Sequence, residues 1–202
     1  MGGSLGKGGF LDSLTSLSSP LHIVMLGLDS AGKTTALYRL KFDQYLNTVP
    51  TIGFNCEKIK GTAGKCKGTS FLVWDVGGQE KLRPLWRSYT RATDGIVFVV
   101  DSADVERFDE AKMELARTMR TPEHTSVPVL VLANKQDLPG AKDVAYVEKA
   151  LGLTDRGAVA QCHVQPACAI IGEGLEEGLD ILYEMICKKK KISKLGGRIK
   201  KK

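Results

Sequence analysis

Residues 27–34 read Gly27-Leu28-Asp29-Ser30-Ala31-Gly32-Lys33-Thr34 and fit the pattern G-x-x-x-x-G-K-[ST]. An apolar run at 21–26 precedes them and a helical pattern at 33–41 follows, which is the strand, loop and helix context that this pattern requires. Glycines let such a loop wrap its backbone N–H groups around phosphate oxygens, and the N-terminus of the helix adds partial positive charge. Lys33 would then reach the β- and γ-phosphates, and the Thr34 hydroxyl would ligate Mg²⁺. The stretch therefore predicts a phosphate-binding loop, or P-loop, that opens an α/β unit.

Further apolar runs alternate with helical patterns along the rest of the chain. The runs lie at 71–76, 95–100, 129–133 and 162–170, and the helical patterns at 105–119, 143–151 and 175–190. Strands that alternate with helices predict a mostly parallel sheet with helices on both faces. Two strand-like pieces, 54–60 and 70–76, flank a glycine-containing tip at 61–68, so one strand pair is predicted to be antiparallel. The fold class is thus α/β, with a mixed six-stranded sheet.

The composition excludes several classes of protein. The 202 residues are 43% hydrophobic, 26% charged and 6% aromatic, which is not the composition of a disordered or collagen-like chain. The longest apolar run, 96–100, is far shorter than the ~18 residues of a membrane-spanning helix, so no span is expected. Five scattered cysteines, without a C-x-x-C pair or a secretory signal, favour a reduced cytosolic protein without disulfides or zinc.

The net charge of +6 comes from the C-terminal end of the chain. Residues 188–202 hold nine Lys and Arg residues and no acid, so the remainder carries −3, from 20 basic and 23 acidic residues. Such a tail favours contact with an anionic surface, and no direct contact of the fold with nucleic acid is expected. Phe10, Leu11, Leu14 and Leu17 have roughly helical spacing. Three parts are therefore predicted: an amphipathic segment at 1–19, one domain at 20–187 and a polybasic tail at 188–202.

A second motif follows the apolar strand at 70–76 and reads Asp75-Val76-Gly77-Gly78-Gln79. Asp75 at the end of this strand would hold Mg²⁺ through water, and the Gly78 N–H would face a γ-phosphate. Gln79 would orient the attacking water. The motif therefore predicts hydrolysis of a nucleoside triphosphate.

Two more motifs point to guanine as the base. Asn134-Lys135-Gln136-Asp137 follows another strand, and the Asp137 carboxylate can accept both N1–H and the exocyclic N2–H₂ of guanine. Adenine presents the opposite pattern there and would leave the carboxylate unpaired. Cys168-Ala169 can turn a backbone N–H toward guanine O6, and Lys135 can lay its stem along the base. The motifs lie on successive strand ends, which predicts a guanine-nucleotide site at the carboxyl edge of the sheet.

With these motifs, residues 20–187 resemble the Ras-superfamily small GTPases, and specifically the ADP-ribosylation-factor-like (Arf-like) family. The resemblance rests on Asp29 in the P-loop and on VPTIGFN at 49–55, WDVGGQEKLRPLW at 74–86 and NKQD at 134–137. The lysine-bearing hairpin tip and the polybasic C-terminus look most like the Arf-like protein 4 branch. By this resemblance Thr51 is the switch I threonine that ligates Mg²⁺ in the GTP-bound state, and residues 77–93 form switch II.

The predicted site is defined by these motifs and this resemblance. Nucleotide-binding residues are Gly27, Leu28, Asp29, Ser30, Ala31, Gly32, Lys33, Thr34, Thr35, Thr51, Asp75, Gly78, Asn134, Lys135, Asp137, Cys168 and Ala169. Gln79 is the catalytic residue, and the metal ligands are Thr34 and Thr51, with Asp75 acting through water. GTP or GDP and Mg²⁺ are the implied cofactors.

The resemblance implies a switch that cycles between an inactive GDP-bound and an active GTP-bound state. No Arg lies in the P-loop or switch I, so hydrolysis of GTP to GDP and phosphate should be slow without an arginine from a partner. Implied partners are exchange factors, GTPase-activating proteins and effectors, with cytohesin-type Arf exchange factors among the effectors. In the family the hairpin between the switches shifts its register and displaces an N-terminal amphipathic helix. A glycine-rich two-stranded edge fixes register only weakly.

Membrane attachment is expected to need two signals. Gly2 is an acceptor for N-myristoylation, although Gly6 stands where the simple pattern has Ser or Thr. One myristoyl chain anchors a protein only marginally, and the basic tail can add attraction to an anionic inner leaflet. The sequence ends without a C-a-a-X cysteine, so prenylation is not expected. The expected location is the cytoplasm and the periphery of the plasma membrane.

Two other functions compete with this one. In the first, the chain is a GTP-binding scaffold whose hydrolysis is unimportant and whose lysine tail binds importins, with a location in the nucleus or nucleolus. Intact Gln79 and Thr51 weigh against it. In the second, the chain is a nucleotide kinase, which Asp137 and the absence of an evident Arg-rich lid segment disfavour.

Overall fold

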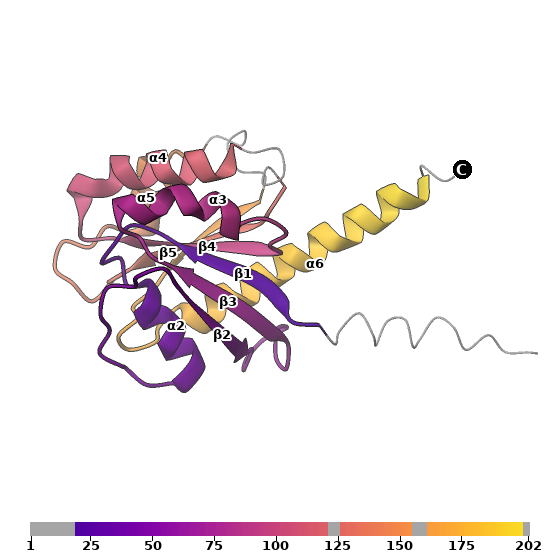
Figure 1. Ribbon diagram of the computed structural model, residues 1–202, viewed down its shortest axis with the longest axis horizontal. Helices are drawn as coiled ribbons and strands as arrows, with labels where there is room; N and C mark the ends of the chain where they lie inside the picture. Colours follow the sequence, from indigo (N-terminus) through magenta and orange to yellow (C-terminus); the bar gives the residue numbers. More distant parts are fainter. Residues whose placement is uncertain (1–18, 121–125, 155–160, 200–202) are drawn as a thin grey trace, which may run out of the picture.

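The computed structural model describes residues 19–120, 126–154 and 161–199, and these ranges form one six-stranded sheet. The strand order is β2-β3-β1-β4-β5-β6 (Figure 1), and every neighbouring pair is parallel except β2 with β3. The strands are β1 (Leu21–Leu26), β2 (Phe54–Lys60), β3 (Ser70–Val76), β4 (Gly95–Asp101), β5 (Val129–Asn134) and β6 (Cys162–Pro166). The predicted α/β fold with a mixed, mostly parallel sheet is therefore confirmed.

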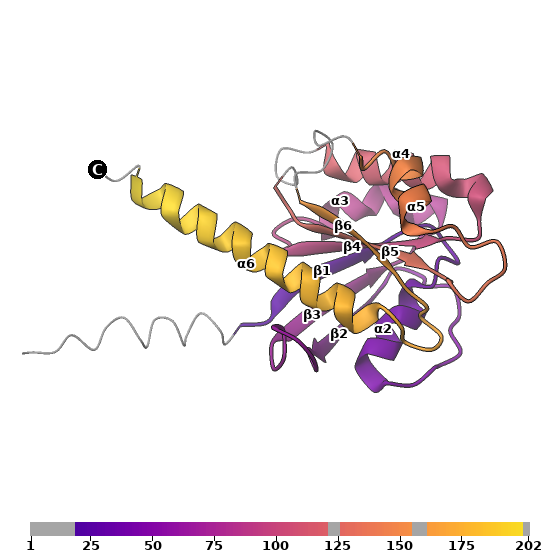
Figure 2. The same ribbon diagram turned by 180° about the vertical axis from the view of Figure 1, so that it is seen from behind.

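Helices cover both faces of the sheet, as Figures 1 and 2 show from opposite sides. On one face α2 (Lys33–Phe42) and α6 (Leu175–Ile199) pack into one hydrophobic cluster with the strands. On the other face α4 (Phe108–Met119) and α5 (Val144–Leu151) pack into a second cluster. The remaining short elements are η1 (Glu80–Leu85), α3 (Trp86–Tyr89) and η2 (Val105–Arg107). Because β4 and β5 are buried on both faces, they appear in the sequence as unbroken apolar runs.

Two predicted elements end several residues away from their predicted ends, and two short elements were not predicted. The last strand ends at Pro166 instead of residue 170. The Ala167 N–H still donates to the Ala133 carbonyl of β5 at 3.0 Å, but the chain then turns, and the Cys168 N–H bonds to the Glu173 carbonyl at 3.0 Å. Helix α6 continues nine residues beyond its predicted end at Lys190 and passes through Gly196 and Gly197 before it ends at Ile199. Residues 80–89, where no helix was expected, form η1 and α3.

The tip of the β2–β3 hairpin is fastened to α6. The Cys66 N–H donates to Asp180 Oδ1 at 2.7 Å, and Lys65 forms an ion pair with Glu184 at 2.6 Å. Gly64 has φ 59°, and a Cβ there would lie 2.2 Å from Asp180 Oδ2, so only glycine allows this approach. The side chain of Cys66 is fully buried in the same contact.

Several predicted features lie outside the described residues. These are the N-terminal amphipathic segment through residue 18, with the lipid acceptor Gly2, and the last three lysines of the tail. Within the ranges that the structure describes, no helix has both the length and the apolar character to cross a bilayer.

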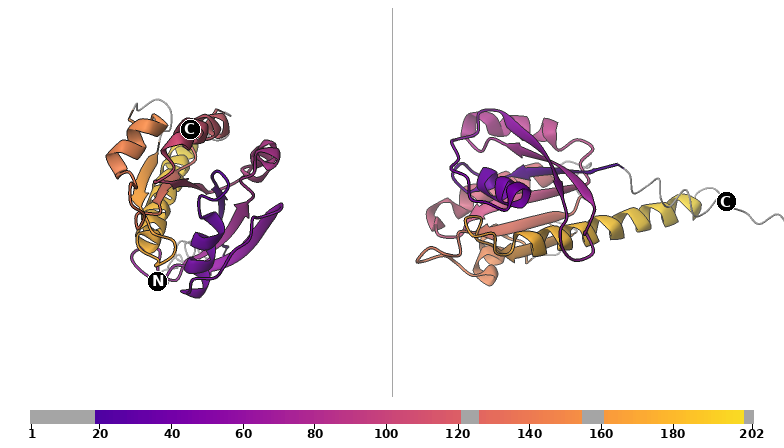
Figure 3. Two further views of the ribbon diagram at one scale, coloured as in Figure 1. Left: turned by 90° about the vertical axis from the view of Figure 1, so that its left-hand side faces the viewer. Right: turned by 90° about the horizontal axis from the view of Figure 1, so that it is seen from below.

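The sheet brings the motif-bearing loops to one edge. The loops after β1, β3, β5 and β6 all leave the carboxyl ends of their strands, on the same side of the molecule (Figure 1). The far end of α6 lies on the opposite side, where the helix runs along the sheet and continues past it (Figure 3). This arrangement separates the motifs from the basic end of the chain.

Candidate nucleotide-binding site

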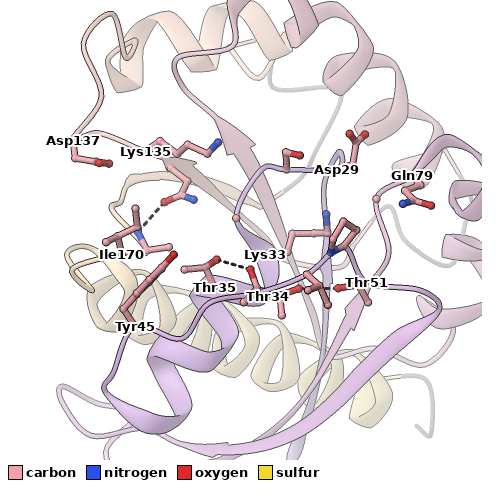
Figure 4. A pocket seen from close by; sticks show the side chains of 18 residues that line it. Asp29, Lys33, Thr34, Thr35, Tyr45, Thr51, Gln79, Lys135, Asp137 and Ile170 are labelled. Atoms are coloured by element: carbon pink, nitrogen blue, oxygen red, sulfur yellow. Dashed lines mark hydrogen bonds between the residues drawn. The ribbon is translucent and has the colours of Figure 1, made fainter.

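The motif loops surround a cleft of about 350 Å³ (Figure 4). Thirteen of the predicted residues line it: Asp29, Ser30, Gly32, Lys33, Thr34, Thr35, Thr51, Gly78, Gln79, Asn134, Lys135, Asp137 and Ala169. Five predicted residues do not line the cleft: Gly27, Leu28, Ala31, Asp75 and Cys168. The predicted residues that line the cleft are therefore up to 140 positions apart, from Asp29 to Ala169.

The P-loop adopts the conformation that its glycines permit. Gly27 and Gly32 have φ of 142° and 95°, and a Cβ on Gly27 would lie 2.2 Å from the Val99 carbonyl oxygen. Lys33 Nζ donates to the Leu28 carbonyl at 2.7 Å, so the loop holds its own lysine in place. Burial lowers the pKa of Lys33 to about 8, against the opposing charges of Asp75 and Asp29. Phosphate oxygens beside this ammonium would favour its charged form.

Asn134 joins the two ends of the site. Its Nδ2 donates to the Ala31 carbonyl of the P-loop at 2.8 Å, and its Oδ1 accepts from the Ala169 N–H at 2.9 Å. Asn134 is 2% exposed, so both bonds are shielded from water. Ala31 thus acts through its backbone carbonyl, which holds the Asn134 side chain, and does not itself line the cleft.

Three oxygen-bearing side chains converge below the phosphate end of the cleft. Thr34 Oγ1 donates to Asp75 Oδ2 at 2.6 Å and lies 2.8 Å from Thr51 Oγ1. Asn55 Nδ2 donates to the same Asp75 oxygen at 3.1 Å. Burial raises the pKa of Asp75, and hydrogen bonds from Thr34 and Asn55 oppose this shift.

The other Asp75 oxygen identifies the kind of ligand that fits. Oδ1 is buried and has no hydrogen-bond partner among the described residues. A buried carboxylate oxygen without a partner is costly, and a bound cation or its water would satisfy it. Two hydroxyls beside a carboxylate form an all-oxygen set, which is what Mg²⁺ prefers. The residues present therefore fit Mg²⁺, with Thr34 and Thr51 as the ligands and Asp75 behind them.

Switch II closes the cleft beside the P-loop. A Cβ on Gly78 would lie 2.5 Å from both the Asp29 nitrogen and the Gly27 carbonyl oxygen, so the glycine packs directly on P-loop backbone. The Gln79 side chain lies on the same side of the cleft as Thr51 (Figure 4). Gly78 and Gln79 thus line the cleft where the backbone of this segment meets the P-loop.

The opposite end of the cleft carries the motif at 134–137, which is predicted to recognise the base. Lys135 and Asp137 lie there, away from Gln79 (Figure 4). Lys135 has φ 66° and forms an ion pair with Asp101 at 2.6 Å, which fixes its long side chain. The thiol of Cys168 donates to Asp137 Oδ1 at 3.1 Å, so Cys168 positions the carboxylate from behind instead of lining the cleft.

Five residues of the lining were not predicted: Tyr45, Thr48, Val49, Pro50 and Ile170. Val49 and Pro50 immediately precede Thr51, and Ile170 follows Ala169, so their neighbours in the sequence could have indicated them. Thr48 lies 3.4 Å from Thr35, oxygen to oxygen, but the two are 13 positions apart and no motif joins them. Tyr45 has no pattern around it that points to a ligand.

Known proteins resemble this chain over most of its length. The model of the ADP-ribosylation factor family matches residues 8–186. The chain is 62% identical to human ADP-ribosylation factor-like protein 4C over 91% of its own length and 95% of that protein. It is 59% identical to the mouse 4A protein over 90% of each chain, and 59% identical to human 4D over 87% of its length and 88% of that protein.

A solved structure extends the comparison to three dimensions. The Arl6 BBS3 small GTPase from Trypanosoma brucei, solved with the bound nucleotide analogue GppNp, superposes with a TM-score of 0.73 at 32% identity. The match covers 85% of this chain and 99% of that one. The chain therefore belongs to the ADP-ribosylation factor family of small GTPases, which are GTP hydrolases, and within it to the Arf-like 4 branch.

Proposed function

We propose that this chain is a membrane-recruited switch whose GTP-bound form has the arrangement described here and binds effectors. The observation that carries this proposal is the convergence of Thr34, Thr51 and Gly78 on the phosphate end of the cleft, next to the unpartnered Asp75 oxygen. Switch I contributes Thr51 and switch II contributes Gly78. A γ-phosphate that holds both would keep the switches together, and its loss would release them.

The cleft would bind the nucleotide from both ends. Lys33 and the P-loop N–H groups hold the β- and γ-phosphates, and the helix α2 begins directly at Lys33, so its N-terminus faces the same oxygens. Asp137 accepts N1–H and N2–H₂ of guanine, with Cys168 holding the carboxylate in place. Thr34 and Thr51 would ligate Mg²⁺, with Asp75 reaching it through water. When bound, Mg²⁺ neutralises charge that develops on the phosphate oxygens.

Hydrolysis needs little covalent chemistry from the protein. Gln79 would orient a water molecule for attack on the γ-phosphorus, and the P-loop would stabilise the charge on the leaving β-phosphate. No arginine is among the described residues that line the cleft. Turnover would therefore be slow until a partner supplies an arginine, which accelerates such reactions by about 10³- to 10⁵-fold.

Recruitment would combine the two ends of the chain. A myristoyl group on Gly2 and the basic residues from Lys188 onward would together hold the GTP-bound form on an anionic inner leaflet at the plasma membrane. Exchange factors and GTPase-activating proteins would set the nucleotide state, and cytohesin-type Arf exchange factors would be effectors. If the tail instead bound importins, the same switch would act in the nucleus.

The substitution Gln79→Leu tests the proposed switch. It removes the group that orients water but leaves the binding contacts, so GTP hydrolysis stimulated by a GTPase-activating extract should fall at least about 100-fold. The measurement is single-turnover hydrolysis, with GTP and GDP affinities measured in parallel. Glu80→Gln, at the neighbouring exposed position, serves as the control. Undiminished stimulated hydrolysis in the Gln79 variant would remove this role from Gln79.

A further inference from the structure

The two glycine peptides of switch II are held from the side away from the cleft. Trp86 Nε1 donates to the Gly77 carbonyl at 3.0 Å, and Arg83 Nε donates to the Gly78 carbonyl at 2.8 Å. In a trans peptide the carbonyl and the following N–H point in opposite directions. Holding the Gly77 carbonyl thus sets the direction of the Gly78 N–H, and holding the Gly78 carbonyl sets that of the Gln79 N–H.

Arg83 is a buried cation outside the cleft. Its side chain is 5% exposed and meets acceptors from three parts of the chain. Besides the Gly78 carbonyl, it donates to Glu110 Oε1 at 2.7 Å and approaches Asp29 Oδ1 at 3.5 Å. A guanidinium is costly to bury unless its donors are paired, so Arg83 is stable in this position only while switch II packs here.

Arg107 completes a closed ring of ion pairs with the same acids. It donates to Asp29 Oδ1 at 2.7 Å and to Glu110 Oε2 at 3.0 Å, and it also reaches the Asp29 carbonyl at 3.3 Å. Hydrogen bonds from Arg83 and Arg107 hold the pKa of Glu110 below its ordinary value, so the acid is charged at neutral pH. The P-loop, η2, α4 and switch II are thus joined through Asp29, Arg107, Glu110 and Arg83.

We propose that Arg83 is a positioning residue that selects the nucleotide: it ties the Gly78 carbonyl to the acids of the P-loop and α4 and so keeps the backbone of Gly78, whose N–H direction Trp86 sets through the Gly77 carbonyl, in place for the third phosphate. The proposal rests on the proposed contact between Gly78 and a γ-phosphate. GDP has no third phosphate and does not need Gly78. Loss of Arg83 should therefore weaken GTP binding and leave GDP binding nearly unchanged.

The test is the ratio of affinities for a non-hydrolysable GTP analogue and for GDP. Arg83→Ala should lower this preference for the analogue about tenfold or more, the size expected for a hydrogen bond made by a charged donor, with the GDP affinity within twofold of wild type. Arg83→Lys keeps the charge but not the planar fork, so it should restore the preference only in part. Arg87→Ala is the matched control, because Arg87 is an exposed arginine of the same segment.

A separate variant distinguishes failure of this inference from failure of the proposed function. Gly78→Ala should abolish the preference for the analogue, since its Cβ would clash with the P-loop backbone. If Gly78→Ala lowers the preference and Arg83→Ala does not, the role of Arg83 is wrong and the proposed switch stands. If neither variant changes it, the contact of Gly78 with the γ-phosphate is wrong as well.

Folding of the variants is checked by GDP binding. Where Arg83→Ala does not fold, Glu110→Gln replaces it, because Glu110 is partly exposed and the amide keeps one acceptor while losing the charge. A smaller loss of preference, about threefold, is then expected. Equal loss of GDP and analogue affinity in either variant would overturn the proposal, because it would indicate a structural role only.

Discussion

Asp137 owes its proposed selectivity to a match between two acceptors and two donors. Its carboxylate accepts from the Cys168 thiol and, in the proposed function, would accept N1–H and N2–H₂ of guanine. In Asp137→Asn the amide presents one acceptor and one donor, which matches xanthine, whose C2 carries an oxygen. The variant should lose GDP affinity by roughly 100-fold or more and gain affinity for XDP.

Competition binding with GDP and XDP measures this change. Asp143→Asn is the control, since Asp143 accepts from the Tyr146 N–H at the start of α5 and lies outside the cleft lining. Equal GDP affinity in wild type and the Asp137 variant would contradict guanine recognition by this residue.

Residues with local neighbours in a motif could be predicted, and residues that act through distant partners could not. The P-loop, Asp75, Gln79 and Asp137 each lie in a short pattern beside a strand, and the structure brings all of these motifs to one edge of the sheet. The bonds of Arg83 instead span 5, 27 and 54 positions. No local pattern contains such partners, because they meet only when the switch and α4 have packed.

The hairpin between the switches has more than its strand pairing to hold its register. The sequence indicates a weakly specified register; in the structure β2 is an edge strand that pairs with β3 alone, while β3 also pairs with β1. Its tip is fastened to α6 by Cys66 and Lys65, residues that carry no motif. A register shift of the hairpin would have to break both contacts. The described structure has one register, so the shift itself stays a prediction.

Removing the acceptor at the tip should loosen this hairpin. In Asp180→Ala the Cys66 N–H loses its partner, so amide exchange at residues 61–68 should accelerate by about tenfold. Hydrogen–deuterium exchange of the GDP-bound protein measures it. Glu177→Ala, at an exposed position on the same helix, should leave the exchange unchanged. Unaltered exchange in the Asp180 variant would mean that strand pairing alone holds the tip.

The whole molecule places its nucleotide cleft and its basic end on opposite sides, so charge removed from one should not affect the other. Lys190 pairs with Asp94 at 2.9 Å and is left intact. Changing Lys188, Lys189 and Lys191 to Gln should weaken binding of the myristoylated, GTP-bound protein to phosphatidylserine liposomes by up to about 100-fold, from ~1 kcal/mol per charge. Nucleotide affinity should not change.

Sedimentation with the liposomes at two salt concentrations measures whether the basic tail contributes to membrane binding. The control replaces three exposed lysines of the hairpin, Lys58, Lys60 and Lys67, with Gln. Raising the salt from 0.1 to 1 M shortens the Debye length from ~10 to ~3 Å and should make wild type behave like the tail variant. If the tail variant sediments like wild type at low salt, the tail is better explained by nuclear import.

The continuous course of α6 has a consequence for how the molecule is oriented. From residue 188 to 199 the helix adds about 18 Å in a straight line, anchored to the domain by Lys190 and by its buried first half. That length exceeds the ~8 Å over which charges are felt at physiological salt. A helix lying flat brings one face along its whole length to the bilayer, whereas an upright helix brings only its end. The angle between helix and membrane, and with it the direction in which the cleft and switches face, should therefore vary with ionic strength and lipid charge.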